Sequence, residues 1–344
     1  MSSKTAALAG KRVLVTGGAG FIGSTLVDHL LSAGCDEILV VDNMLHGRLE
    51  HLAEAVRSDK VRVIDVDIRD RSAMARLVAG IDTVFHQATL RAGHCVSEPR
   101  LAMEVMADAT FDLLEQCVAS RVRKVVLASS ASVCGMAEGL PSPEGRRGLH
   151  LDRTLHGVMK SFCEGLLRAF RTMYGQDAVA LRYFDAYGPR MDIHGPYTEQ
   201  MIRWIERIEA ATPPIIYGDG LQTMDLVHVD DIARANILAA TTDVSGVALD
   251  IGSGLQTSSL DLARMLAGVM GRGWLAPVHM ADRGAFPLAR PAADPRPAEQ
   301  LLGFRADRPL ETGLRELVAW WRQASSWTAA EPETGEIPPG VTAR

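Results

Sequence analysis

The chain has 344 residues, of which 47% are hydrophobic and 23% are charged, and its formal net charge is −6. These values are typical of a globular protein, and they exclude a disordered chain, a collagen-like repeat and a generally basic nucleic-acid-binding protein. At roughly 150 residues per domain, the length predicts two domains or one large α/β unit with an insertion.

The cysteines favour neither a disulfide framework nor a metal site. They are odd in number and scattered without a CxxC pair: Cys35, Cys95, Cys117, Cys134 and Cys163. No segment approaches the roughly 18 apolar residues of a membrane span, and the N-terminal residues contain no separate apolar stretch of a secretory signal. We therefore expect a cytoplasmic protein with no membrane partner, no nucleic-acid partner and no metal.

Strand-like and helix-like segments alternate through the first half of the chain. The predicted strands are 11–16, 37–42, 61–67, 83–88, 124–130 and 178–184. The predicted helices between them are 21–33, 48–57, 71–79, 98–120 and 154–173. Near-continuous apolar strands that alternate with helices indicate an α/β fold, with a parallel sheet covered on both faces.

After Phe184 the alternation loosens, and loops rich in Gly and Pro separate shorter elements. A helix is expected over 230–241 and a buried strand over 247–251, followed by helices and a short strand near 274–280. The last residues are polar and rich in Pro and Gly, which predicts a disordered tail over 328–344.

The segment 16–23 (TGGAGFIG) joins a predicted strand to a predicted helix. Gly17, Gly20 and Gly23 permit a tight turn, a close backbone approach to a pyrophosphate, and close packing of helix on strand. Asp42 ends the next strand, where a carboxylate accepts a hydrogen bond from a ribose 2′-OH and repels a 2′-phosphate. This spacing predicts a dinucleotide site that prefers NAD to NADP.

Further motifs extend this pattern along the chain. They are VDN at 41–43, DIRD at 67–70, FHQA at 85–88, SSASVCG at 129–135, RYFDAYGPR at 182–190, DLVHVDDIARA at 225–235 and LLGF at 301–304. With these motifs the chain resembles, over about residues 10–323, the extended short-chain dehydrogenase/reductases of the NAD-dependent sugar epimerase/dehydratase family, which include UDP-glucose and UDP-glucuronate 4-epimerases.

The resemblance implies a Rossmann-type doubly wound parallel sheet with a smaller, interleaved C-terminal α/β substrate domain. The NAD-binding domain is expected over 10–184 plus about 225–253, and the substrate-binding domain over 185–224 plus about 254–325. The residues expected to bind NAD are Gly17, Gly20, Phe21, Ile22, Gly23, Asp42, Asn43, Asp67, Ile68, Gln87, Ala88 and Lys160.

The catalytic signature of the family is a Ser or Thr followed by a Tyr-x-x-x-Lys pair. Ser130 and Lys160 occupy the Ser and Lys positions here, but His156 stands at the Tyr position. A neutral imidazole, with an ordinary pKa of about 6.5, accepts a proton at neutral pH without the activation that a phenol needs. Two interpretations remain open: His156 is a working acid/base, or it is a packing replacement in a catalytically weakened protein.

The expected substrate residues also depart from the family pattern. Asp185 stands where relatives have an Asn that bonds the nucleotide-sugar, and Met224 where many have a phosphate-binding Arg. A carboxylate repels a diphosphate, so we expect a nucleoside, a monophosphate or another small glycoside unless an Arg elsewhere compensates. The candidate substrate residues are His94, Ser132, Cys134, Asp185, Arg190, Met224 and Arg290.

The resemblance implies an enzyme that oxidises a sugar hydroxyl to a transient ketone, rearranges the sugar and returns the hydride. The rearrangement is either epimerisation or water elimination, although Ala131 and Ser132 replace the acids that many family dehydratases carry there. Alternatives are an NAD-binding protein without catalysis and a reductase that releases NADH.

Relatives commonly form homodimers through two helices of each subunit, here 98–120 and 154–173.

Overall fold

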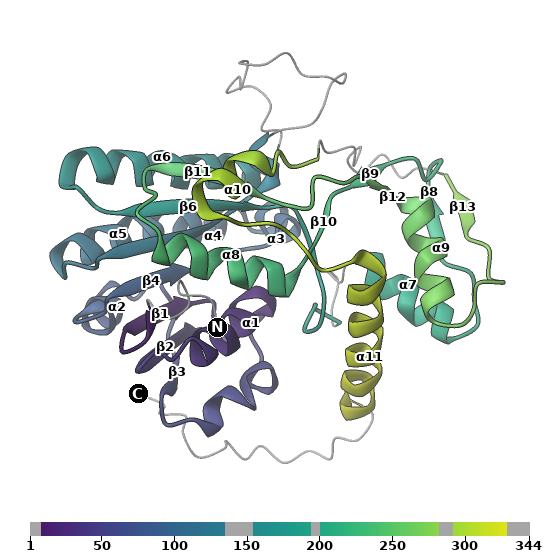
Figure 1. The fold of residues 1–344 in the computed structure, drawn as a ribbon, viewed down its shortest axis with the longest axis horizontal. Coiled ribbons are helices and arrows are strands. Elements are labelled where there is room, and N and C mark those ends of the chain that lie inside the picture. Colours follow the sequence, from purple (N-terminus) through teal and green to yellow (C-terminus); the bar gives the residue numbers. More distant parts are fainter. Residues whose placement is uncertain (1–7, 135–153, 194–199, 282–291, 329–344) are drawn as a thin grey trace.

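A seven-stranded parallel sheet forms the centre of the molecule, as shown by the computed structural model, which describes residues 8–134, 154–193, 200–281 and 292–328 (Figure 1). Its strand order is β3-β2-β1-β4-β5-β6-β11. The strands are β1 (Arg12–Thr16), β2 (Glu37–Asp42), β3 (Val61–Asp65), β4 (Thr83–His86), β5 (Lys124–Ser130), β6 (Ala178–Tyr183) and β11 (Val247–Ile251). The order reverses beside β1, which confirms the predicted doubly wound fold and leaves a crevice at the carboxyl ends of the strands.

Strand register brings the ends of the sequence motifs to one edge of the sheet. Thr16 at the end of β1 pairs with Val41 of β2 on one side and with His86 of β4 on the other. Ser130 at the end of β5 pairs with Tyr183 at the end of β6. Segments far apart in the sequence therefore reach the same crevice.

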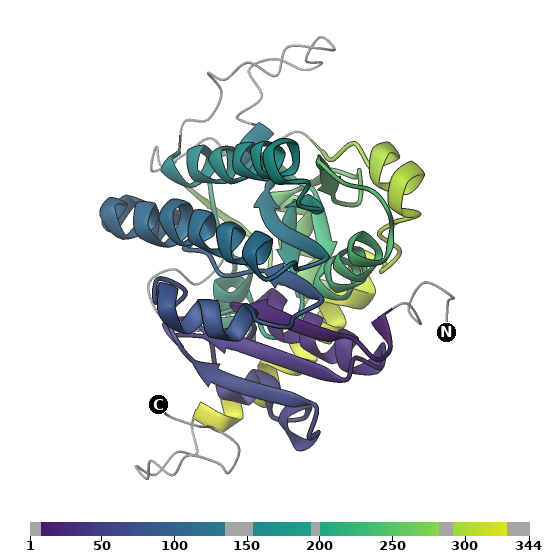
Figure 2. The same cartoon turned by 90° about the vertical axis from the view of Figure 1, so that its left-hand side faces the viewer.

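Helices cover both faces of the sheet (Figures 1 and 2). One face packs against α1 (Phe21–Ser32), α8 (Val229–Thr241) and α10 (Arg296–Leu302). The opposite face packs against α2 (Arg71–Val78), α5 (Ala109–Ala119) and α6 (Leu155–Tyr174). Successive residues of β1 alternate between the two cores, with Val13 and Val15 in one and Leu14 in the other, which explains its continuous apolar sequence.

Two predicted helices differ from expectation. The segment 48–57 forms two 3₁₀ turns, Leu49–Leu52 and Ala55–Arg57, because its apolar residues at 49, 52 and 55 recur every three positions. The segment 98–120 follows α3 (Ala92–Ser97) and consists of α4 (Pro99–Ala102), a π-helical turn (Met103–Asp108) and α5. The Met106 carbonyl in this turn accepts a hydrogen bond from Cys163 Sγ at 3.0 Å, so a side chain of α6 satisfies it.

A second lobe lies beside the sheet, on the right of Figure 1, and has its own apolar core. Its helices are α7 (Gln200–Glu209), α9 (Ser259–Val269) and α11 (Leu310–Thr328). Its paired strands are β8 (Ile215–Tyr217) with β13 (Val278–Met280), and β9 (Thr223–Met224) with β12 (Thr257–Ser258). The parallel pair β7 (Asp185–Tyr187) and β10 (Leu226–His228) carries the chain between sheet and lobe. Of the predicted tail, Thr328 ends α11, and 329–344 lie outside the described residues.

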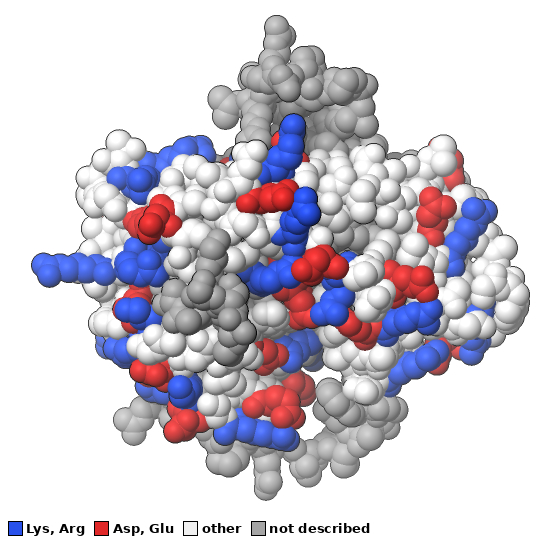
Figure 3. All heavy atoms as spheres, in the orientation of Figure 1, with Lys and Arg blue, Asp and Glu red and all other residues white. Residues whose placement is uncertain are grey.

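The surface drawn in Figure 3 carries acidic and basic side chains interspersed with one another, without a large patch of one sign. Within the described part of the chain, no helix combines the length and the apolar character that crossing a membrane requires.

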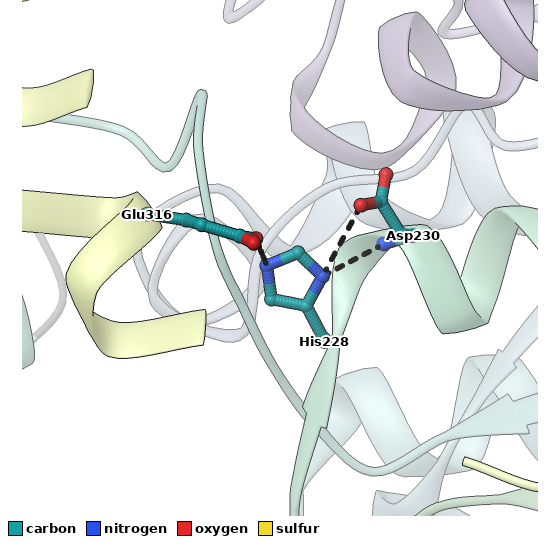
Figure 4. A group of neighbouring side chains, drawn as sticks. All are labelled: His228, Asp230 and Glu316. Atoms are coloured by element: carbon teal, nitrogen blue, oxygen red, sulfur yellow. Dashed lines mark hydrogen bonds and ion pairs between the residues drawn. The ribbon is translucent and has the colours of Figure 1, made fainter. Parts of the chain in front are cut away.

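A buried histidine links the two lobes (Figure 4). His228 caps α8 by accepting the Asp230 N–H at Nδ1 (3.3 Å), and its Nε2 lies 3.3 Å from Glu316 of α11. Arg308 donates to both carboxylates, at 2.9 Å to Asp230 and 3.1 Å to Glu316. The three potential metal-binding side chains are close together, but one guanidinium already neutralises both acids and a backbone N–H occupies Nδ1. The cluster therefore serves to join α8 to α11.

Replacing His228 with glutamine should make the free energy of unfolding depend less steeply on pH at acidic pH. Burial lowers the pKa of His228 to about 4 in the folded protein, whereas in the unfolded chain it is about 6.5. Between these two pH values the unfolded chain therefore binds more protons than the folded protein does. The stability from the neutral imidazole is complete above the unfolded pKa and is lost as the pH falls toward the folded one, at up to about 1.4 kcal/mol per pH unit. Chemical unfolding across this range measures the slope. The exposed His279→Gln variant is the control, and an unchanged slope in His228→Gln would contradict the assignment.

Candidate functional site

A cavity of about 720 Å³ opens at the carboxyl ends of the central strands and extends to the second lobe. All twelve residues predicted to bind the dinucleotide line it: Gly17, Gly20, Phe21, Ile22, Gly23, Asp42, Asn43, Asp67, Ile68, Gln87, Ala88 and Lys160. Ser130, His156, Asp185 and Met224 line the same cavity. Residues from both predicted domains therefore contribute to one site.

The glycine loop has the geometry that a bound pyrophosphate requires. Gly17 has a φ of +66°, and a Cβ there would lie 2.7 Å from the Ala88 nitrogen. A Cβ on Gly23 would collide with the Gly17 carbonyl, so α1 approaches β1 only because this residue lacks a side chain. The N-terminus of α1 consequently faces the cavity with free backbone N–H groups.

Asp42 is buried beside this loop. Its carboxylate accepts hydrogen bonds from the backbone N–H groups of Ala19 and Met44, both at 3.0 Å, which fix its orientation. Burial raises the pKa of Asp42 above its ordinary value. Held in this way on the cavity lining, the carboxylate can accept a hydrogen bond from a ribose hydroxyl.

Beyond Asp42 the cavity is bounded by a polar cluster on the loop after β3. Asn43 donates to Asp67 at 2.9 Å, and the Arg69 guanidinium donates to the same carboxylate at 2.9 and 3.0 Å. These bonds from Arg69 hold the pKa of Asp67 low, at about 2. With Ile68 between them, Asp67 and Arg69 form a wall of the cavity whose polar groups are mostly hydrogen-bonded to one another. This wall suits a heterocyclic base.

A buried triad closes the cavity on the side of β4 and β6. Tyr183 donates to Gln87 Oε1 at 3.0 Å, and Asn236 donates to the Tyr183 oxygen at 2.8 Å. Burial raises the pKa of Tyr183, and its hydroxyl is already bonded, so this phenol does not replace the tyrosine missing from position 156. The sequence predicted no role for Tyr183, because within an apolar strand it reads as a core residue.

Ser130, His156 and Lys160 all line the cavity. Lys160 is 5% exposed, and its ammonium donates to the Ala128 carbonyl at 2.7 Å. Burial lowers the pKa of Lys160 to about 8, so the charged form still predominates at neutral pH. A cation is thus fixed one helical turn from the imidazole.

A second serine connects Ser130 to His156. The Ser132 hydroxyl donates to Ser130 Oγ at 2.9 Å and lies 3.2 Å from His156 Nδ1. Thr154 caps α6 by accepting the Gly157 N–H at 3.1 Å, which places His156 in the first turn of the helix. The imidazole of His156 therefore faces Ser132 and Ser130.

Behind these residues, a buried ion pair fastens α6 to the sheet. Arg182 of β6 donates to both oxygens of Glu164 on α6, each at 2.7 Å, and Ser129 donates to Glu164 at 2.7 Å. Glu164 is 3% exposed and Arg182 5%. The helix that carries His156 and Lys160 is therefore locked to the strand that carries Ser130.

The part of the cavity nearest the second lobe is lined mainly by apolar and acidic side chains. Asp185 and Met224 line it, together with Trp204 and the ion pair between Arg91 and Asp192 (2.6 Å). Sequence reasoning missed Arg91 and Asp192. The position of Arg91, just after the fourth strand, was the available signal for it, whereas nothing local marks Asp192.

Of the remaining predicted substrate residues, those that the structure describes do not line the cavity. His94 contacts it through His46, a lining residue whose Nε2 is 2.7 Å from His94 Nδ1. Arg190 forms an ion pair with Asp28 at 2.7 Å. Cys134 is half-buried, and Arg290 lies outside the described residues.

Known proteins resemble this chain in sequence and in fold. The model of the NAD dependent epimerase/dehydratase family matches residues 13–252. The UDP-glucose 4-epimerase of Mycolicibacterium smegmatis is 32% identical over 318 residues, which cover 91% of this chain and 99% of that protein.

Two solved structures have the same fold. The UDP-N-acetylglucosamine 4-epimerase of Methanobrevibacter ruminantium, in complex with UDP-N-acetylmuramic acid, has a TM-score of 0.85 at 30% identity and covers 92% of this chain and 99% of its own. A dTDP-glucose 4,6-dehydratase variant of Streptomyces venezuelae, solved with NAD bound, has a TM-score of 0.81 at 28% identity and covers 92% and 98%. The resemblance seen in the motifs is confirmed: the chain belongs to the NAD-dependent epimerase/dehydratase family, with NAD as its cofactor.

Proposed function

We propose that this protein is an enzyme that oxidises a hydroxyl of a sugar to a transient ketone and then reduces it again, with His156 as the acid/base in place of tyrosine. The carrying observation is that Ser130, His156 and Lys160 line the same cavity as the glycine loop and Asp42. The substrate is the sugar of a nucleotide-sugar or of a nucleoside-like molecule. The rearrangement between the two redox steps is epimerisation, in which the keto sugar turns over before reduction.

Each residue has a role that follows from its chemistry. When bound, NAD would supply the acceptor for the hydride of the sugar carbon and the donor for its return. His156 accepts the hydroxyl proton and returns it, while Ser130 donates a hydrogen bond to the same substrate oxygen. The Lys160 ammonium, which donates to the Ala128 carbonyl, would bond the nicotinamide ribose, and Asp42 would bond the adenosine ribose. In this assignment the NAD-binding domain comprises 10–184 plus about 225–253, and the substrate domain 185–224 plus about 254–325.

The charges at the substrate end support a substrate with little negative charge. Among the described residues of the lining, the cations are already engaged: Arg91 by Asp192, Arg69 by Asp67 and Lys160 by the Ala128 carbonyl. Asp185 adds a carboxylate. We infer that a nucleoside, a monophosphate or a small glycoside suits this end better than a nucleoside diphosphate sugar does.

Asp185 also supports a second candidate reaction, the elimination of water next to the transient ketone. An elimination needs a second acid/base group near the substrate, and Asp185 is a carboxylate on the substrate end of the lining. Ala131 and Ser132, which follow Ser130, supply no carboxylate, so this reaction would differ from that of dehydratases with acids at those positions.

The outer face of α5 and α6 supports a homodimer. Large hydrophobic side chains are exposed on these helices and on the π-helical turn before α5: Met103, Phe111, Val158, Phe162, Met173 and Tyr174. The two helices lie side by side at the surface (Figure 2), so their apolar residues form one face that a second copy can cover.

Turnover in D₂O against a panel of nucleotide-sugars, nucleoside monophosphates and nucleosides tests the proposed reaction. Mass spectrometry should show a product of unchanged mass and altered retention for epimerisation, or the loss of one water for elimination. His156→Ala should lower kcat at least about a hundredfold, because it removes the acid/base. The NAD released on denaturing the variant is the control for cofactor binding. Full turnover by His156→Ala with NAD bound would contradict the proposal.

Restoring the residues that relatives carry at the substrate end should raise affinity for a diphosphate. In NAD-loaded Asp185→Asn/Met224→Arg protein, removal of a carboxylate and addition of a guanidinium should lower the Kd for UDP-glucose at least about tenfold in calorimetry. Asp185→Asn alone should give a smaller gain, and uridine should bind equally to both proteins. An equal Kd for UDP-glucose in wild type and double variant would show that other cations already hold the diphosphate.

Phe162→Glu should convert the protein from dimer to monomer, because it places a charge on the apolar face of α6. Light scattering coupled to size exclusion measures the mass. Leu221→Glu, on the second lobe and 67% exposed, is the matched control and should remain dimeric. A monomeric wild type, or a dimeric Phe162→Glu variant, would contradict this interface.

A further inference from the structure

Ser132 bonds to two of the residues that the proposed function assigns to catalysis. Its Oγ is 2.9 Å from Ser130 Oγ and 3.2 Å from His156 Nδ1, and its backbone N–H donates to Ser130 Oγ at 3.2 Å. A hydroxyl has one proton, so Ser132 donates to one of these neighbours and accepts from the other. The direction of this proton therefore influences which nitrogen of His156 is protonated.

We infer one direction from these two contacts. The closer contact is with Ser130, and there Ser132 is the donor. Its oxygen is then left as an acceptor toward the imidazole, so Nδ1 carries a proton. A neutral imidazole protonated at Nδ1 has its free lone pair on Nε2.

The same contacts set the direction of the Ser130 hydroxyl. Ser130 Oγ accepts two hydrogen bonds from Ser132, one from the backbone N–H and one from the hydroxyl. With both lone pairs engaged, Ser130 can only donate its own proton. Ser130 and His156 both line the cavity, whereas Ser132 does not and therefore acts through them.

We propose that Ser132 is a positioning residue that holds His156 as the Nδ1–H tautomer, so that Nε2 receives the proton of the substrate hydroxyl. This inference rests on the proposed role of His156 as the acid/base. On oxidation the substrate O–H proton moves to Nε2, and the C–H electron pair leaves as hydride to NAD. Both return in the reverse step. Throughout, Ser130 donates to the substrate oxygen and Ser132 accepts from Nδ1.

Ser132 is needed because histidine stands at position 156, where the family pattern has tyrosine. A phenol has one oxygen that both gives and accepts the proton, so its orientation needs no tautomer control. An imidazole has two nitrogens, and the partner of one decides whether the other is a base. The short turn Ala131–Cys134 after β5 and the Thr154 cap of α6 bring this partner to His156.

Long-range ¹H–¹⁵N correlation spectra of histidine-labelled protein loaded with NAD test the tautomer without a substrate. His156→Gln identifies the signal among the ten histidines. At a pH well above the ordinary imidazole pKa of about 6.5, wild type and Ser132→Thr should show the Nδ1–H form, and Ser132→Ala should shift toward Nε2–H. The Nε2–H form in wild type, or an unchanged tautomer in Ser132→Ala, would overturn the proposal.

Kinetics separate this inference from the proposed function. With a substrate found in the panel, Ser132→Ala should lower kcat about tenfold with little change in KM, and Ser132→Thr should restore most of it. Full kcat in Ser132→Ala, with His156→Gln inactive, would overturn the role of Ser132 and leave the proposed function in place. Full turnover in His156→Gln would overturn both.

Discussion

The buried ion pair between Glu164 and Arg182 is the constraint on which the geometry of the site depends. Residues 156, 160 and 164 recur every four positions on α6, so the imidazole, the ammonium and the carboxylate lie on one face of the helix. Glu164 and Arg182 are bonded through both carboxylate oxygens and have almost no solvent exposure. Without Arg182, the buried Glu164 would keep only the Ser129 hydroxyl at 2.7 Å and the Arg168 guanidinium at 4.0 Å, so the pair holds the helix against β6.

This fixed helix also explains how a lysine can remain charged inside the protein. Cys163, Cys95 and Glu164 act to raise the pKa of Lys160, and its ammonium donates to a backbone carbonyl of β5. Burial acts in the opposite direction and is the stronger effect. The balance leaves a protonated ammonium on the wall of an otherwise mostly apolar cavity. That placement suits a ribose, whose hydroxyl oxygens accept hydrogen bonds from an ammonium.

The sequence predicts those parts of the site that depend on local structure. The glycine turn, the acid at the end of β2 and the i, i+4 pair of His156 and Lys160 each follow from a short segment whose conformation is set by its own residues. The parallel sheet with helices on both faces also follows, because alternating strands and helices admit few other arrangements. Contacts between distant segments were not predicted. The Arg91–Asp192 pair spans 101 positions and the Gln87–Asn236 bond 149, and no local pattern marks such partners.

The two ends of the cavity differ in the hydrogen-bonding groups and charges that a ligand would meet. At the dinucleotide end, backbone N–H groups at the helix terminus face the cavity, and Asp42 is oriented but retains acceptor capacity. At the other end, the described cations are paired and the remaining surface is apolar or acidic. A family fold thus carries an ordinary cofactor half and an altered substrate half. The exchange of tyrosine for histidine lies where the two halves meet. There the proposed change of acid/base involves more than one residue, because the hydrogen-bond partner of one imidazole nitrogen selects which nitrogen is the base. Ser132, bonded to both His156 and Ser130, is the residue to which we assign that selection.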